Sequence, residues 1–201
     1  MSDDHYANLE TLNLEQSIWE RVYTVAPLVL VGTMDPDGTP DLAPKHMAFP
    51  LGWENYFGFV CAPSHGTYRN IKRTGEFTVS YPRPDSIVST SLAASPRCED
   101  AKPIIGAIKT FPAQTMDCVL AANSYCHLEC QHINTIDGFG ANSLITGRIV
   151  AAHIDRAALR SSDRDDTDLL LNSPLLAYLY PGRFAVIGNT QAFPFPSGMR
   201  R

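Results

Sequence analysis

The sequence predicts a small antiparallel β-barrel with attached helices, and three observations support this prediction. About six apolar or alternating runs of strand length follow one another, separated by turn signals such as DPDGTP at 35–40. Only two helical patterns interrupt them, whereas a parallel sheet needs a helix after nearly every strand. The strands are also spaced too irregularly for an immunoglobulin-like sandwich.

The composition suits one domain with short appendages. Of the 201 residues, 44% are hydrophobic and 18% are charged, which is enough apolar material for a sizeable core. The net charge of -5 and the lack of a basic stripe argue against a nucleic-acid partner. No apolar run is long enough to span a membrane, and the acidic N-terminus does not resemble a signal peptide. Five cysteines without such a signal favour reduced thiols and a cytoplasmic location.

The N-terminal segment predicts an amphipathic helix over residues 12–24. Leu14, Ile18 and Val22 recur at helical spacing on one side of it. Asn13 precedes them and is a suitable N-cap residue. The segments that follow are a buried strand at 26–34, a turn at 35–40, an irregular or edge strand with two prolines at 41–53, and a third strand at 55–62.

A short helix and a strand form the next unit. The segment TYRNIKRTG makes about two helical turns and ends at Gly75, a residue type favoured just after a helix. In the strand that follows, Phe77, Val79 and Tyr81 share one face. The remaining predicted segments are a helix at 86–94, a loop at 95–103, a strand at 125–133, a turn at 137–142, a long strand at 143–155, a polar and loosely helical stretch at 156–172, and a short helix or turn before a last strand within 174–189.

A small polar cluster stands directly before the helix that ends at Gly75. It consists of Ser64, His65, Gly66 and Thr67. The N-terminus of a helix presents backbone N–H groups and a partial positive charge, so hydroxyl and imidazole donors there suit a phosphate, and a glycine allows close approach. The alternative is an ordinary cap in which Ser64 or Thr67 satisfies the first turn. The pattern alone leaves both interpretations open.

The cysteines and histidines at 125–133 raise the question of a metal site. Read as a strand, this segment places Cys126, Cys130 and His132 on one face and His127 on the other. The thiols then lie on the leucine side, and no CxxC pair completes a set of four ligands, so we expect no metal. The G-x-S-x-G, G-x-G-x-x-G and G-x-x-x-x-G-K-[ST] motifs are absent, which argues against a hydrolase elbow, a Rossmann site and a P-loop.

An ordered series of segments identifies a family resemblance. The series begins with PLVLVGTMDPDGTPDLAPKHMAF, continues with TYRNIKRTGEFTVSYP, and ends with HLEC, SLITGRIVAAHID and GRFAVIGN. This order resembles the flavin reductase-like family with an FMN-binding split barrel, over roughly residues 20–190. The resemblance implies a mainly β fold with helices, built as a split antiparallel β-barrel. It divides the chain into a helical extension at 1–24, the split-barrel domain at 25–190 and a tail at 191–201.

The resemblance also implies a function. The expected protein is an FMN-dependent oxidoreductase that passes a hydride from NADH or NADPH to flavin and on to an acceptor. Members of the family are homodimers with FMN between the subunits, so a homodimer is expected, with a monooxygenase or an electron-transfer protein as partner. Two alternatives stay open: a flavoredoxin-like electron-transfer protein that does not use nicotinamide, and a non-catalytic split-barrel module for another ligand.

Residues are assigned to the flavin site through this resemblance alone. His153 matches a histidine near the flavin and is the candidate catalytic residue, although a barrel-rim histidine without chemistry is an equal alternative. Lys45 departs from the small polar residues usual in its strand, and its charge either faces the flavin pyrimidine edge or points to solvent. The implied cofactor-binding residues are Lys45, His46, Met47 and Ala48 along the isoalloxazine ring, Cys61 and Ala62 beneath the ring and ribityl chain, and Ser64, His65, Thr67 and Asn70 around the phosphate.

Overall fold

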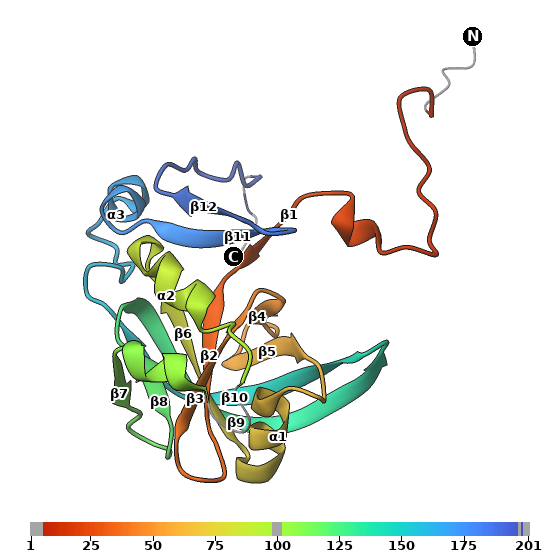
Figure 1. The fold of residues 1–201 in the computed structure, drawn as a ribbon. Coiled ribbons are helices and arrows are strands. Elements are labelled where there is room, and N and C mark those ends of the chain that lie inside the picture. Colours follow the sequence, from red (N-terminus) through yellow and green to blue (C-terminus); the bar gives the residue numbers. More distant parts are fainter. Residues whose placement is uncertain (1–5, 98–101, 197, 199–201) are drawn as a thin grey trace.

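The computed structural model describes residues 6–97, 102–196 and 198 and is built mainly from antiparallel strands (Figure 1). The strands are β1 Thr24–Pro27, β2 Val29–Met34, β3 Pro40–Lys45, β4 Ala48–Pro50, β5 Tyr56–Cys61, β6 Glu76–Pro82, β7 Thr110–Pro112, β8 Val119–Ala121, β9 Ser124–Phe139, β10 Asn142–Ile154, β11 Leu175–Tyr180 and β12 Arg183–Ile187. The helices are α1 Gly66–Thr74, α2 Ile87–Leu92 and α3 Asp166–Asn172, with the 3-10 turns η1 Ile18–Glu20, η2 Pro84–Ser86 and η3 Pro103–Ala107.

A curled seven-stranded sheet forms the barrel body, in the order β3-β2-β6-β9-β10-β5-β4. All its neighbouring strands pair antiparallel, which confirms the predicted split antiparallel barrel. Two smaller sheets, β1-β11-β12 and β7-β8, complete the fold. The proline-containing segment predicted as an edge supplies both edges, β3 and β4, because proline cannot donate a ladder hydrogen bond.

The main hydrophobic core fills the inside of the curled sheet. Phe57 and Phe59 of β5, Phe77 of β6, Ile71 of α1 and Ile145 of β10 are almost completely buried there. The rings of Phe59 and Phe77 meet edge to face, with their centroids 5.4 Å apart. Val79 of β6 lies in the same core and Tyr81 packs against it, which confirms that Phe77, Val79 and Tyr81 share one face, and α1 packs against the core through Ile71 and Tyr68.

A second layer covers the opposite face of the sheet. The segment between β6 and β9, for which the sequence predicts little beyond one short helix, forms α2, η3 and the β7-β8 hairpin. Its apolar residues pack against Leu30 and Leu42 of the sheet. The hydroxyls of Thr78 and Ser80 in β6 are buried on this side, where they bond to the backbone of β8. The polar side of β6 is thus a second buried face, rather than a solvent-exposed one.

The helix predicted for residues 12–24 is wrong. Only the single 3-10 turn η1 forms there, and β1 begins at Thr24. Leu14 is 82% exposed and Trp19 is 51% exposed, so no apolar surface of the described chain covers that side. A short amphipathic segment without packing is a marginal helix. Asn13 accepts a hydrogen bond from the backbone N–H of Glu15, which makes a local turn in place of a helix cap.

Two further predictions need correction near the C-terminal half. The short helix or turn expected at the start of 174–189 is strand β11, which forms a hairpin with β12. The predicted strand at 125–133 extends to Phe139, because it pairs with β10 nearly to its tip. The turn of this long hairpin lies at 140–141, within the predicted 137–142, and Gly138 and Gly140 adopt positive φ angles of 105° and 63°.

The described residues contain no helix long and apolar enough to cross a membrane. Among the same residues, no group of three or more histidine, cysteine or acidic side chains is placed to hold a metal ion. Cys126 and Cys130 lie on the core side of β9, as the strand pattern predicts, and His127 lies on the other side against Ser80.

Candidate functional site

A cavity of about 370 Å³ opens where β3 ends, α1 begins and the segment after α2 crosses them. We call it the cationic pocket, because basic side chains dominate its charged lining. Its lining residues are Asp41, Ala43, Pro44, Lys45, Ser64, His65, Gly66, Thr67, Arg69, Ala93, Ala94, Ser95, Pro96, Arg97 and Lys102. Four of these, Lys45, Ser64, His65 and Thr67, are residues that the sequence assigns to the flavin site.

Buried carboxylates hold the basic side chains of this pocket in place. Arg97 donates two hydrogen bonds to Asp35, at 2.8 and 2.9 Å, and lies 2.9 Å from a carboxylate oxygen of Asp41. Lys102 donates to Asp41 at 3.3 Å and to the carbonyl of Leu42 at 2.8 Å. The hydrogen bond to Asp35 raises the pKa of Arg97, whereas burial lowers the pKa of Lys102. The two cations are therefore fixed in position before any ligand arrives.

The start of α1 faces the same cavity. The N-cap residue is His65, and its side chain makes no capping hydrogen bond. Neither Ser64 nor Thr67 acts as the cap, so the capping alternative raised by the sequence does not describe this turn. Partial burial and the charges of Lys45, Arg69 and Lys102 lower the pKa of His65. These three cations, together with the unpaired first-turn backbone N–H groups of the helix, make the surroundings of the helix N-terminus positive.

Gly66 leaves room for Arg97 at the start of the helix. A Cβ atom added to Gly66 would lie 2.6 Å from Nη2 of Arg97 and 2.9 Å from its Nε. The guanidinium therefore sits directly against the backbone at the first turn of α1. Guanidinium, ammonium, imidazole and hydroxyl donors converging on a helix N-terminus fit a phosphate monoester, which takes charge-assisted hydrogen bonds from all of them.

Three other predicted residues lie behind the pocket instead of lining it. Asn70 is buried and donates to Thr33 at 3.0 Å and to Asp35 at 2.8 Å, so it positions the carboxylate that holds Arg97. Cys61 is a core residue whose Sγ lies 3.8 Å from Nδ1 of His65, and burial raises the pKa of its thiol. The carbonyl of Ala62 accepts the backbone N–H of His65 and shapes the turn into α1.

The structure separates the four residues predicted along the flavin ring. Lys45 lines the cationic pocket, and Ala48 is buried in the core. Met47 is exposed, and its carbonyl accepts a hydrogen bond from the backbone N–H of Val60. His46 turns to the other side of the strand, into a second and larger cavity of about 700 Å³. We call this cavity the aromatic pocket; it shares Pro44 and Ala94 with the cationic pocket.

His153 lies elsewhere in the fold. It pairs with His127 across β10 and β9, and its Nε2 lies 2.9 Å from Oε1 of the buried Glu129. Among the described residues it lines neither of the two pockets. Within a single chain, His153 therefore belongs to a structural cluster around Glu129, and its catalytic role stays a prediction.

Sequence reasoning missed Arg97 and Lys102, the most firmly held cations of the pocket. Arg97 reaches Asp35 across 62 positions of the chain, and Lys102 reaches Asp41 across 61. One feature of the sequence could have indicated them. The predicted loop at 95–103 contains two basic residues, although no role was predicted for it. Nothing local in the sequence shows that Arg97 and Lys102 lie near the start of α1.

Comparisons with known proteins agree with this fold. Residues 22–185 match the family model of the flavin reductase like domain. Flavoredoxin from Desulfovibrio vulgaris (Miyazaki F) is 20% identical, with a TM-score of 0.75, covering 94% of this chain and 100% of that one. Nitrilotriacetate monooxygenase component B from Bacillus cereus is 14% identical, with a TM-score of 0.78 over 92% and 98%. An NADH:FAD oxidoreductase from Streptomyces globisporus is 12% identical, with a TM-score of 0.65 over 81% and 86%.

Because all three sequence identities are low, these structural likenesses establish the fold alone. The family match covers β3 and α1, which border the cationic pocket, and most of the β11-β12 hairpin. With a match over most of its length and the split-barrel topology in place, the chain belongs to the flavin reductase-like domain family.

Proposed function

We propose that this protein is an FMN-dependent oxidoreductase whose cationic pocket holds the phosphate of the flavin. The observation that supports it most directly is the convergence of Lys45, Arg97 and Lys102 on the uncapped N-terminus of α1. A phosphate monoester carries close to two negative charges at neutral pH, which this donor set matches. Riboflavin, which has the same ring without the phosphate, would leave these cations without an anionic ligand.

In this proposal, different residues bind the phosphate and the ring of the cofactor. Thr67 and His65 offer a hydroxyl and an imidazole at the helix start, and Lys45 of β3 and Lys102, directly before η3, supply positive charge. In the same proposal the isoalloxazine ring would lie along residues 45–48 and bond to their backbone, apart from the carbonyl of Met47, which already accepts the backbone N–H of Val60. When bound, FMN supplies the hydride chemistry between a nicotinamide and an acceptor. The protein contributes position and electrostatics, with His153 as a candidate for completing the site across a homodimer.

NADH or NADPH is the proposed electron donor, and one structurally similar protein is named as an NADH:FAD oxidoreductase. Another is a monooxygenase component, which supports a monooxygenase as partner. A flavoredoxin-like electron carrier is the second candidate, because a flavoredoxin has the same fold. The proposed location is the cytoplasm, which the odd number of cysteines in the sequence supports.

The proposal is tested by adding FMN to the purified protein and then NADH or NADPH under anaerobic conditions. We expect FMN to bind with a Kd of about 1 μM or tighter and the absorbance near 450 nm to bleach on addition of the nicotinamide. Binding without bleaching by either nicotinamide would contradict the reductase and favour the electron carrier. Failure of FMN to bind at tens of micromolar would overturn both and favour a split-barrel module for another ligand.

A further inference from the structure

The cationic pocket contains one side chain of a type that ordinarily changes its charge near neutral pH. Among the described lining residues, His65 is the only histidine, and the other charged members are aspartate, lysine and arginine side chains. His65 is an exposed residue, so a ligand in the cavity can reach it. Its Nδ1 lies 3.8 Å from Sγ of Cys61, a thiol whose pKa is raised by burial. Nε2, on the other side of the ring, makes no hydrogen bond in the described part of the chain and is left for a ligand.

The groups around His65 favour its neutral form in the free protein. Partial burial and the positive charges of Lys45, Arg69 and Lys102 lower its pKa. The three cations come from separate parts of the fold, because Lys45 ends β3, Arg69 belongs to α1 and Lys102 stands directly before η3. Arg69 also donates to the carbonyl of Ser64 at 2.5 Å, which keeps its guanidinium beside the turn into α1. An imidazolium at this position is therefore repelled by all three cations.

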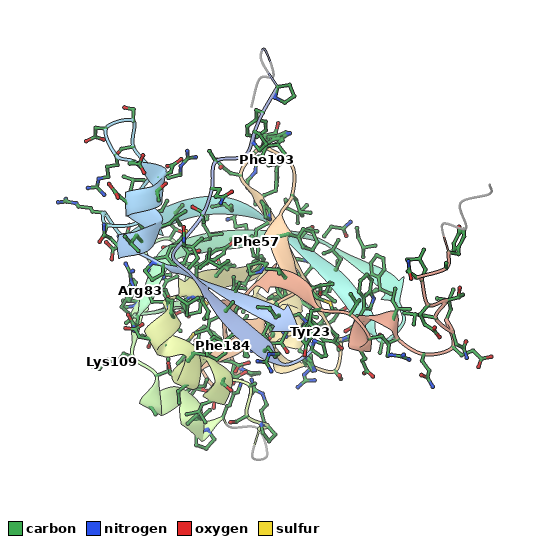
Figure 2. The ribbon with its side chains drawn as sticks, turned by 90° about the horizontal axis from the view of Figure 1, so that it is seen from above. Tyr23, Phe57, Arg83, Lys109, Phe184 and Phe193 are labelled. Atoms are coloured by element: carbon green, nitrogen blue, oxygen red, sulfur yellow. The ribbon has the colours of Figure 1, made fainter. Side chains whose placement is uncertain are left out.

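The remaining charged groups near the pocket do not offset this positive potential. Asp41 is the one carboxylate among the described lining residues, and it already contacts Arg97 at 2.9 Å and Lys102 at 3.3 Å. Figure 2 shows the β11-β12 hairpin crossing over α2, and Arg183 of this hairpin lines the aromatic pocket instead of the cationic one. No carboxylate among the described lining residues is therefore left to hold a proton on His65.

A bound phosphate reverses this balance. A phosphate monoester has a second pKa of about 6, so at neutral pH it carries close to two negative charges. An anion within hydrogen-bond distance favours the charged form of a histidine and raises its pKa. The imidazolium donates from both nitrogens, with Nε2–H free for the phosphate and Nδ1–H facing the sulfur of Cys61, which is a weak acceptor. Protonation of His65 is therefore unfavourable in the free protein and favourable beside a phosphate dianion.

We propose that His65 takes up one proton when the cationic pocket binds the phosphate of FMN. This uptake rests on the proposed function, because FMN supplies the phosphate. The proton comes from the solvent at neutral pH and from the phosphate monoanion itself below about pH 6, and no other bond forms or breaks. Because the pKa of His65 is then higher in the complex than in the free protein, the added affinity for the dianion is complete below the free-protein pKa. It is lost as the pH rises through the pKa of the complex, so acidification tightens the hold on the flavin.

The NMR signal of the His65 ring, followed through a pH titration of protein with isotope-labelled histidine, measures the uptake directly. We expect a titration midpoint below 6.5 in the free protein and a midpoint at least about one unit higher at saturating FMN. His65→Gln should remove this signal and so identifies it. Lys45→Met should raise the midpoint of the same signal in the free protein, because it removes a neighbouring positive charge. His132→Gln is the matched control outside the pocket and should leave the His65 signal unchanged.

The affinity for FMN across the same pH range gives a second readout. For a midpoint shift of about one unit, FMN should bind roughly two- to threefold tighter at pH 6 than at pH 8, with the protonation of its own phosphate included. An unchanged His65 midpoint in the FMN complex, or the same pH dependence in His65→Gln, would overturn the proposal while leaving FMN binding intact. If FMN does not bind, the proposed function fails, and inorganic phosphate at about 50 mM replaces it as the probe. A midpoint higher than in sodium chloride of equal ionic strength would then support proton uptake at the pocket, and an equal midpoint would overturn it.

Discussion

Glu129→Gln is expected to lower the free energy of unfolding at pH 7 by about 2–3 kcal/mol. Glu129 is 0% exposed in the middle of β9. Its carboxylate accepts hydrogen bonds from the backbone N–H groups of Gln114 and Thr115, at 2.9 and 2.7 Å, and from the Thr115 hydroxyl at 2.6 Å. His153 adds a fourth contact at 2.9 Å. A glutamine of the same shape loses the charge and turns an N–H₂ donor toward groups that are themselves donors.

The pH dependence of this difference identifies its cause. Burial alone would raise the pKa of Glu129, but the bonds from Gln114, Thr115 and His153 outweigh it and lower the pKa to about 2. Because the folded pKa lies below the ordinary value of 4.5, the stabilisation is complete above about pH 4.5 and is lost as the pH falls toward 2. Wild type and Glu129→Gln should therefore converge in acid.

Chemical denaturation of both proteins at pH 7 and at several values below pH 4.5 measures the effect. Glu54→Gln, in the exposed turn between β4 and β5, is the matched control and should leave stability unchanged. A difference between wild type and Glu129→Gln that stays constant down to pH 2 would contradict the account, because it would show that the carboxylate charge is not the stabilising element.

Arg97→Met is expected to destabilise the fold by about 3 kcal/mol and to weaken FMN binding. Arg97 pairs with Asp35 and Asp41, which are 7% and 3% exposed. Removing the guanidinium leaves Asp35 with its bond from Asn70 and Asp41 with Lys102, so buried negative charge loses most of its compensation. The cationic pocket loses a positive charge at the same time, and its remaining carboxylates repel a phosphate.

Arg160→Met provides the same substitution in an exposed ion pair. Arg160 makes a two-pronged contact with Asp166 at 2.8 and 2.9 Å, but both side chains are largely in solvent. Exposed pairs contribute little, so this variant should show no measurable change in urea unfolding or in FMN affinity. Equal behaviour of the two variants would contradict the structural role given to Arg97.

Local sequence patterns were sufficient to predict an element of secondary structure where its own residues determine its burial or its end. The strands around Val31, Phe59 and Val79 are each buried along most of their length. A strand of this kind needs a short apolar run, and such runs are visible in the sequence. The end of α1 was predicted from Gly75, which adopts the left-handed φ of 74° that favours glycine. The same reasoning failed at residues 12–24, because helical spacing does not supply the partner surface that stabilises a helix.

The candidate site was predicted only in part for a related reason. Ser64, His65 and Thr67 lie within four consecutive positions at the start of a helix, so their grouping is visible in the sequence. Arg97 and Lys102 join them in the same pocket, and their carboxylate partners lie about sixty positions away along the chain. Lys45 ends β3 and His46 lies in the bend that follows, and the two neighbours line different pockets, which a local pattern does not predict.

The central claim is that the cationic pocket recognises the phosphate of FMN. The most direct test compares the Kd of the protein for FMN with its Kd for riboflavin, by flavin fluorescence quenching at 50 mM salt. The account predicts that FMN binds at least 100-fold tighter, which is about 2.7 kcal/mol of recognition from the phosphate. Affinities within threefold of each other would contradict it, because the phosphate would then contribute nothing at this pocket.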